Sequence, residues 1–156
     1  MRGMHVSAKV DYAMRALLEI ARATDNGSRQ LVKGDQLAVA QQIPARFLEG
    51  ILRQLRQAGI VASQRGAEGG YRLARSPDDI TVADVVRALD GPLADVRGGR
   101  PENAEYNGAA ENLKDVWVAT RAALRGVLDH VTLAQIVSGN LPSAVTSRTA
   151  DPAAWS

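Results

Sequence analysis

The sequence contains no cysteine among its 156 residues. This absence excludes disulfides, thiolate metal sites, cysteine-ligated iron–sulfur clusters and a cysteine nucleophile. Aromatic residues are also few (one Phe, two Trp and three Tyr), so the core must be built from Leu, Ile, Val and Ala. No run approaches ~18 apolar residues, and the chain does not begin with an apolar signal segment. We therefore expect a soluble, cytoplasmic protein that does not contact the membrane, with translation starting at Met1 or at Met4.

Acidic residues are scarce in the first half of the chain. Residues 1–75 carry twelve Lys and Arg against six Asp and Glu, a net charge of +6, whereas residues 76–156 carry seven against eleven, a net charge of −4. This asymmetry indicates that the first half binds a polyanion such as nucleic acid. Chance clustering on a solvated surface is the alternative.

Apolar residues at helical spacing predict a first helix over 8–23, capped by Ser7. Asp11 lies four residues before Arg15, a spacing that favours an ion pair. Turn residues at 24–28 then end the helix.

A short helix is expected over 33–41, followed by a basic, amphipathic helix that begins at Pro44 and ends at Gly59. Two helices this close in sequence are typical of a helix-turn-helix. The apolar stripe of the second helix consists of Phe47, Leu48, Ile51, Leu52 and Leu55.

Two short strands are expected over 60–64 and 71–74, joined by a glycine-rich turn. A phosphate-binding loop is a poor alternative, because the turn lacks a GK[ST] ending and no helix follows it. A further helix begins after the cap Thr81 and ends at Gly91. A hairpin directly behind a helix-turn-helix is the order of a winged helix.

The second half contains a polar loop over 93–107 and a long helix over 111–130. The apolar stripe of this helix has too little of its own chain to cover it, so we expect it to meet a second copy. A short helix over 132–139 and a flexible tail follow. The residues expected at the dimer interface are Leu113, Val116, Trp117, Thr120, Leu124, Val127 and Leu128.

Several side chains of the basic helix and the hairpin are suited to DNA. Arg can pair with guanine and Glu with cytosine, and an Arg at a wing can enter the minor groove. An ordinary solvated helix face is the alternative. Gly50 is unusual inside a helix, which indicates either close approach to DNA or tight packing between helices. The expected DNA contacts are Lys33, Pro44, Ala45, Arg46, Phe47, Glu49, Gly50, Arg53, Arg65, Gly66 and Arg72.

Catalysis has little support in the sequence. The two histidines, His5 and His130, are far apart, and neither HExxH nor GxSxG occurs. A metal site formed by His5 and Asp11 is a weak alternative. We expect no enzyme activity, no metal and no cofactor.

The segments "IPARFLEGILRQLRQAGIV" and "QRGAEGGYRLARSPDDITVADVVRALDGP", followed by the late long helix, resemble the IscR/NsrR/CymR-type family of bacterial winged-helix transcription regulators. The resemblance covers roughly residues 4–140. It implies a homodimer that acts as a regulator, here expected to be a repressor, on a palindromic operator. Arg46, Phe47 and Glu49 match the recognition-helix contact region, and Arg65 with Gly66 matches the wing.

The chain departs from this family in the segment 93–111, where many relatives carry sensor cysteines and this sequence has none. Lys33 and Gln42 also differ from the usual cap and turn residues. The resemblance implies a cluster-free member with an unknown small-molecule or protein effector, or none. We expect any effector pocket between the first helix, the 93–107 loop and the long helix near Trp117. Rival interpretations are a metal-responsive regulator and an interaction module that has lost DNA binding.

The predicted fold class is mainly α with a small β-hairpin. It comprises a winged helix-turn-helix domain over 4–91, a loop over 92–110, a dimerisation helix and a short helix over 111–140, and a tail over 141–156.

Overall fold

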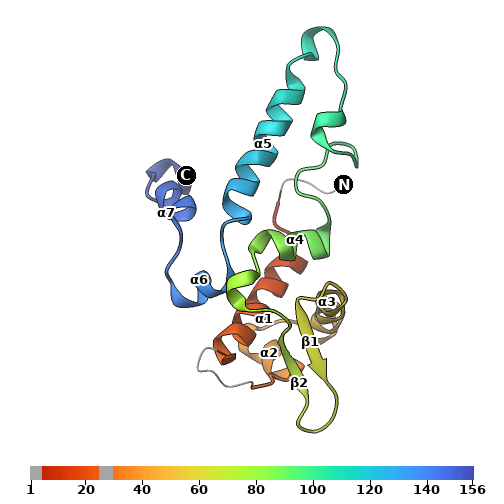
Figure 1. Ribbon diagram of the computed structural model, residues 1–156, viewed down its shortest axis with the longest axis vertical. Helices are drawn as coiled ribbons and strands as arrows, with labels where there is room; N and C mark the ends of the chain where they lie inside the picture. Colours follow the sequence, from red (N-terminus) through yellow and green to blue (C-terminus); the bar gives the residue numbers. More distant parts are fainter. Residues whose placement is uncertain (1–4, 25–29) are drawn as a thin grey trace.

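The computed structural model describes residues 5–24 and 30–156. Residues 25–28 of the predicted turn and both candidate start residues lie outside this part. The described chain is mostly helical and carries one two-stranded antiparallel sheet, as predicted (Figure 1).

Helix α1 (Ala8–Thr24) lies at the centre of the core. Its inner side chains Leu17 and Ile20 are fully buried, and it packs against α2, α3, α4, α6 and β2. Ser7 caps it as predicted, because the Val10 N–H donates to the Ser7 hydroxyl oxygen over 3.1 Å. The same hydroxyl donates to Asp90 over 2.7 Å and so ties the start of α1 to the end of α4.

Helices α2 (Gly34–Gln41) and α3 (Ala45–Gln57) form the helix-turn-helix. The turn contains Gln42, a non-glycine residue with a left-handed φ of 53°, and the buried Ile43. Pro44 lies just before α3 rather than in its first turn. Its carbonyl oxygen accepts hydrogen bonds from the N–H groups of Phe47 and Leu48 over 3.0 and 3.1 Å. Pro44 therefore accepts the first hydrogen bonds of the helix although it precedes α3.

The inner face of α3 buries Leu48, Ile51, Leu52 and Leu55, as predicted. The placement of Phe47 on this buried stripe was wrong, because its side chain is 55% exposed. Phe47 lies at the edge of the stripe in the first turn of α3, and its side chain remains open to solvent.

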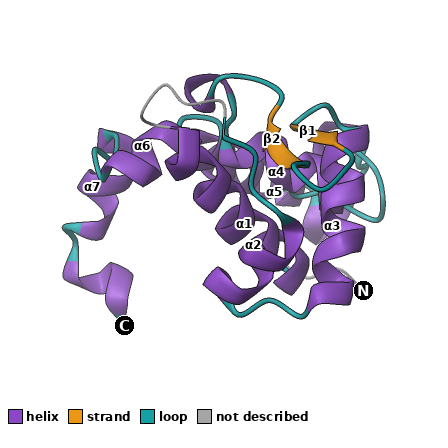
Figure 2. Cartoon of the chain, turned by 90° about the horizontal axis from the view of Figure 1, so that it is seen from below, coloured by secondary structure: helices purple, strands orange, loops and turns teal. Residues whose placement is uncertain are grey.

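Strands β1 (Val61–Gln64) and β2 (Gly70–Leu73) form the predicted hairpin, with Val61 opposite Leu73. A third segment joins them, because Val32 and Tyr71 exchange backbone hydrogen bonds of 2.9 and 2.7 Å. This pairing was not predicted from the sequence, since a single bridging residue has no periodicity. It fixes the hairpin to the chain just before α2 (Figure 2).

Helix α4 (Val82–Asp90) has the predicted capping box of Thr81 and Asp84. Beside this cap, the Val82 N–H donates to the Val131 carbonyl over 2.9 Å, so the chain returns to the winged unit after α5. Helix α6 (Leu133–Ser138) then packs against α1, with Leu133 fully buried. The sequence grouped α6 with the long helix, whereas the structure packs it into the core of the winged unit.

Helix α5 (Leu113–Leu128) rises away from the winged unit (Figure 1). Helix α7 (Ser143–Thr149) and a 3-10 turn (Pro152–Trp155) occupy the segment expected to be a tail. The Trp155 indole N–H donates to the Thr149 carbonyl over 2.8 Å, which closes this turn onto α7. No helix within residues 5–24 and 30–156 is long and apolar enough to cross a membrane.

Candidate nucleic-acid interface

The outer face of α3 is open to solvent. Gly50 is partly exposed, and the other predicted contact residues of this helix and its start are exposed: Pro44, Ala45, Arg46, Phe47, Glu49 and Arg53. The face lies opposite the buried stripe, because α3 is amphipathic with its apolar side chains turned to α1 and α4.

The charges on this face are weakly paired. The Arg53 guanidinium lies 3.9 Å from the Glu49 carboxylate, and both side chains are more than half exposed, so water screens the pair. The Arg46 guanidinium lies 5.5 Å from the centre of the Phe47 ring. Within the described ranges Arg46 forms no ion pair with a carboxylate, so its donors are available to a ligand.

Gly50 faces open space on this helix. A Cβ atom built at Gly50 would meet no atom within 4 Å. The explanation by tight packing between helices was therefore wrong. The open space leaves room for close approach of an external backbone at this position.

The hairpin tip presents Arg65, Gly66 and Glu68 to solvent. The Gly69 N–H donates to the Gly66 carbonyl over 3.0 Å and closes the turn. A Cβ atom at Gly69 would lie 2.1 Å from the Gln64 carbonyl oxygen, so only glycine fits there. The narrow tip thus depends on the glycines that made this stretch conspicuous in the sequence.

The hairpin is anchored to the core by Leu73, which is buried, and by Tyr71, which is partly buried. Arg72 points outward on β2, and Lys33 is exposed beside the Val32–Tyr71 bridge. Sequence reasoning missed Arg56, whose guanidinium donates to the Ser63 hydroxyl over 3.3 Å. This contact joins α3 to β1, and its signal in the sequence was only one more arginine on a basic helix.

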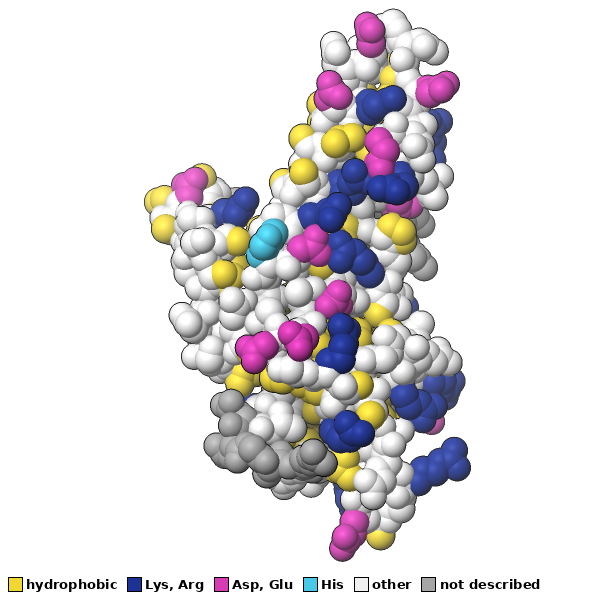
Figure 3. All heavy atoms as spheres, in the orientation of Figure 1, with side chains coloured by type: hydrophobic (Ala, Val, Ile, Leu, Met, Phe, Trp, Pro, Cys, Tyr) yellow, Lys and Arg dark blue, Asp and Glu magenta, His cyan; other side chains and the backbone are white. Residues whose placement is uncertain are grey.

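These contacts join α2, α3 and the hairpin. Basic side chains gather at the lower right of the surface in Figure 3, the side on which Figure 1 places α3 and the hairpin. Positive charge on an exposed helix face beside a narrow hairpin suits the phosphates and groove edges of duplex DNA.

No group of three or more His, Asp or Glu side chains that could hold a metal occurs in the described part of the chain. The predicted pairing of Asp11 is confirmed, because its carboxylate lies 3.1 Å from the Arg15 guanidinium.

The predicted dimer residues lie on α5, and none of the residues of this helix is buried. Val116 is 53% exposed and Leu124 is 37% exposed. The side chains of Leu113, Trp117, Thr120, Val127 and Leu128 are half-buried.

A pocket of about 510 Å³ lies in the region expected for an effector. Its walls are the end of α4, the loop 91–101 and the second half of α5. The first helix and Trp117 do not line it, so the expected walls were partly wrong. The reason is that α4 and the loop lie between α1 and this side of α5 (Figure 1).

This fold and its basic surface define a bacterial-type winged helix-turn-helix regulator of the DNA-binding class. The Rrf2 family model, described as an iron-dependent transcriptional regulator, matches residues 6–139. The HTH-type transcriptional regulator Rv1287 of Mycobacterium tuberculosis is 48% identical over 142 residues, which cover 91% of this chain and 86% of the relative. The chain belongs to the Rrf2 family, whose members regulate transcription and are not enzymes.

Solved structures agree with this assignment. The cysteine regulator CymR of Bacillus subtilis superposes with a TM-score of 0.73 at 31% identity and covers 88% of this chain and 98% of CymR. IscR of T. potens superposes with a TM-score of 0.70 at 32% identity and covers 88% of this chain and 89% of IscR.

A cysteine-ligated iron–sulfur cluster does not fit the residues of this chain. Iron–sulfur clusters are held chiefly by cysteine thiolates, and the sequence has no cysteine. Several residues of the segment from Pro92 to Pro101 line the arginine-rich pocket.

Proposed function

We propose that the protein is a homodimeric, sequence-specific DNA-binding repressor of a palindromic operator. Helix α3 enters the major groove, with Arg46 and Glu49 at base edges. The hairpin follows the adjacent minor groove with Arg65, while Lys33, Arg53 and Arg72 contact phosphates. Each half-site takes one winged unit.

The observation that carries this proposal is the rigid connection between the exposed face of α3 and the hairpin. The Arg56–Ser63 contact and the Val32–Tyr71 bridge fix the two surfaces relative to each other. A fixed spacing between a helix and a wing lets both engage neighbouring grooves without a further ordering cost. Open space at Gly50 supports close approach of a DNA strand to α3.

The exposed apolar stripe of α5 supports the dimer. A helix of 16 residues without a single buried side chain is not stable on its own in water, since most helical stability comes from packing of an apolar face. A second copy of α5 supplies that packing and gives the two-fold symmetry that a palindromic operator requires.

Electrophoretic mobility shifts with the upstream region of its own gene test the DNA binding. We expect a specific shift that weakens steeply as salt rises, because each neutralised phosphate releases counterions. A scrambled fragment of equal length and composition is the control. No shift of any fragment at low salt would mean that the chain is an interaction module instead.

In this proposal, a dimer bound at a promoter represses transcription because it occupies DNA that RNA polymerase needs. Genome-wide mapping of bound sites, combined with transcript levels after deletion of the gene, tests this. We expect inverted repeats at the bound promoters and raised transcripts after deletion. Lowered transcripts at the same promoters would make the protein an activator.

A further inference from the structure

The pocket beside α5 is lined by four arginines from three separate segments: Arg87 on α4, Arg100 in the loop, and Arg121 and Arg125 on α5. Lys and Arg side chains run along this part of the molecule among acidic ones (Figure 3). Arg121 and Arg125 are four residues apart and therefore share one side of the helix. By helical spacing, both arginines lie beside the apolar stripe rather than within it.

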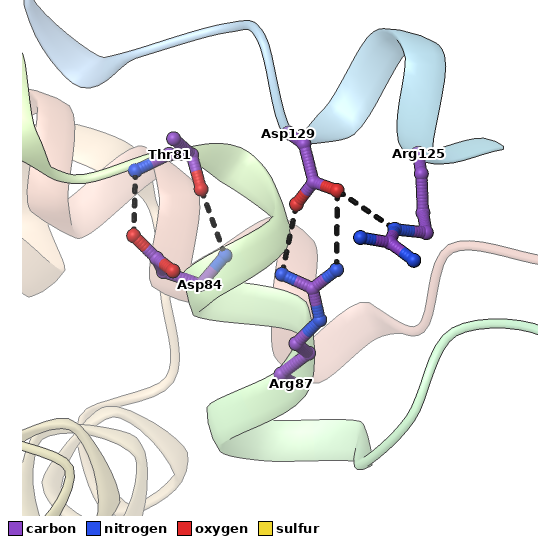
Figure 4. Close-up of polar contacts among 5 residues, drawn as sticks. All are labelled: Thr81, Asp84, Arg87, Arg125 and Asp129. Atoms are coloured by element: carbon purple, nitrogen blue, oxygen red, sulfur yellow. Dashed lines mark hydrogen bonds and ion pairs between the residues drawn. The ribbon is translucent and has the colours of Figure 1, made fainter. Parts of the chain in front are cut away.

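Two carboxylates hold these arginines in place. Asp129 lies 2.8 Å from Arg87 and 3.0 Å from Arg125 (Figure 4). Glu102 lies 2.7 Å from both Arg100 and Arg121. Each carboxylate therefore fixes one pair of guanidinium groups.

The guanidinium groups keep donors for another partner. Arg100 and Arg125 meet their carboxylates through Nε, which leaves their Nη atoms, and a guanidinium carries five N–H donors. With Asp95, which also lines the pocket, the site contains four positive charges against three negative ones. The excess charge and the remaining donors suit an anion.

The rest of the pocket is apolar or bare backbone. Leu93 and Pro101, which are buried, line it together with Gly98 and Gly99. A volume of about 510 Å³ is within the range of small-molecule sites. Apolar and arginine side chains in one pocket match a molecule with both a hydrocarbon part and an acidic group.

The loop over the pocket is held in an unfavourable conformation. Three non-glycine residues of the described chain have positive φ, and two of them, Ala94 and Arg97, lie in this loop at 50°. Backbone bonds of 2.8 and 2.9 Å between Val96 and Gly99 close it. Strained loops of this kind cluster at ligand clamps and switch regions.

We propose that this pocket binds a small organic anion, a carboxylate or phosphate ester with an apolar portion, and that its occupancy alters DNA affinity. The coupling rests on the proposed DNA binding, whereas the binding of the anion does not. An anion that draws Arg87 toward Arg121 would act across the α4–α5 junction, which joins the winged unit to the dimer helix. A ligand shifts the equilibrium between two arrangements of this junction only if it binds one arrangement more tightly than the other.

Isothermal titration calorimetry on the full, DNA-free protein tests the site with salicylate, citrate and inorganic phosphate as probes. Salicylamide, which lacks the charge, is the matched neutral probe. We expect at least one anion to bind once per chain and salicylamide not to bind. If none of the three anions binds, or if salicylamide binds as well as salicylate, the anion site does not exist.

Variants and spectra locate the binding. Arg100→Gln should weaken it about tenfold, the effect of removing one charge-assisted hydrogen bond. Arg22→Gln is the matched control, because Arg22 is 71% exposed and paired with Glu19, as Arg100 is 73% exposed and paired with Glu102. The backbone amide resonances of Gly98 and Gly99 should shift in the unaltered protein. Binding that is unaffected by Arg100→Gln and leaves both glycine amides unmoved would place the anion elsewhere and overturn the proposal.

Fluorescence anisotropy of labelled operator DNA tests the coupling. We expect the bound anion to change DNA affinity in the unaltered protein and to do so less in Arg100→Gln. An anion that binds in the pocket while DNA affinity stays constant would refute the coupling alone. A protein that binds the anion but no DNA would refute the proposed function and leave the site standing.

Discussion

At the scale of single residues, the described arginines differ in their partners. Arg87, Arg121 and Arg125 are fixed by carboxylates of the α4–α5 region. Arg46 and Arg65 are exposed and form no ion pair within the described chain. A guanidinium group that is already paired with a carboxylate gains less free energy from a contact with a phosphate. The unpaired arginines are therefore the ones we expect to dominate DNA affinity.

Replacing Arg65 with Ala should weaken specific DNA binding by about 1–3 kcal/mol and reduce preference for A·T pairs at the wing position. The reason is the loss of a guanidinium from the narrow hairpin tip. Anisotropy titrations with A·T and G·C variants of the operator measure both effects. Arg22→Ala on the far end of α1 is the control. Unchanged affinity and unchanged A·T preference would show that Arg65 does not read the groove.

Gln42 should be replaceable by Gly with a gain in stability. Its left-handed φ of 53° costs a residue with a side chain roughly 1 kcal/mol, and the greater freedom of Gly in the unfolded chain offsets part of that gain. We expect the free energy of unfolding to rise by about 0.5 kcal/mol, measured by urea denaturation. Ala40→Gly, in the preceding helical turn, should lower it by about 1 kcal/mol. A fall for both variants would contradict the strain at Gln42.

At the scale of elements, helices with caps and periodic apolar residues could be predicted from the sequence. The capping box of Thr81 and Asp84 and the buried face of α3 are confirmed within a residue or two. Pairings between distant segments could not be predicted, since the Val32–Tyr71 bridge depends only on tertiary placement. The helical turns after Pro142 were missed because the segment is short and lacks an apolar period.

Asp129 should stabilise the junction between α4 and α5 in a pH-dependent manner. The hydrogen bond from Arg87, assisted by Arg125, lowers the pKa of the Asp129 carboxyl below its ordinary value. Because the pKa is lower in the folded state, the ionised carboxylate stabilises the folded protein at pH values above the unfolded-state pKa of about 3.9. This stabilisation is lost as the pH falls through the still lower folded-state pKa. We expect Asp129→Asn to lower the free energy of unfolding by about 1 kcal/mol at neutral pH, the upper range for a partly exposed pair.

Urea denaturation of both proteins at neutral pH and at a pH below the lowered folded-state pKa of Asp129 measures the difference. It should shrink toward zero in acid, because Asp129 is then protonated in the original protein as well. Glu111→Gln, at an exposed residue before α5, should have little effect at either pH. A difference that persists in acid would mean that Asp129 acts through packing rather than charge.

At the scale of the whole molecule, the exposed face of α3 could be predicted from the sequence, whereas the walls of the pocket beside α5 could be predicted only in part. The face of α3 follows from a helical period and an excess of arginine, both visible in one segment. The pocket combines Arg87, Arg100, Arg121 and Arg125, which are spread over about a quarter of the chain. No local sequence pattern predicts such a site, and only Arg121 and Arg125 on α5 have a recognisable helical spacing.

In the proposed mode of action, operator binding depends on a dimer. A carboxylate placed on the exposed apolar stripe of α5 would have to be buried against the second copy, which is strongly unfavourable. The double variant Val116→Glu, Leu124→Glu should therefore be monomeric. A monomer engages one half-site only, so its affinity for the full operator should fall by about a hundredfold or more.

Analytical ultracentrifugation measures the assembly, and anisotropy titrations measure binding to full and half operators. Ala122→Glu is the matched control, because Ala122 is exposed and lies on the opposite side of α5 by helical spacing. It should leave both the dimer and operator affinity unchanged. Affinity for a half operator should be equal in all three proteins, since the winged unit is untouched. If the double variant still forms a dimer that binds the full operator normally, the seam lies on another surface, and the apolar stripe of α5 has a different partner.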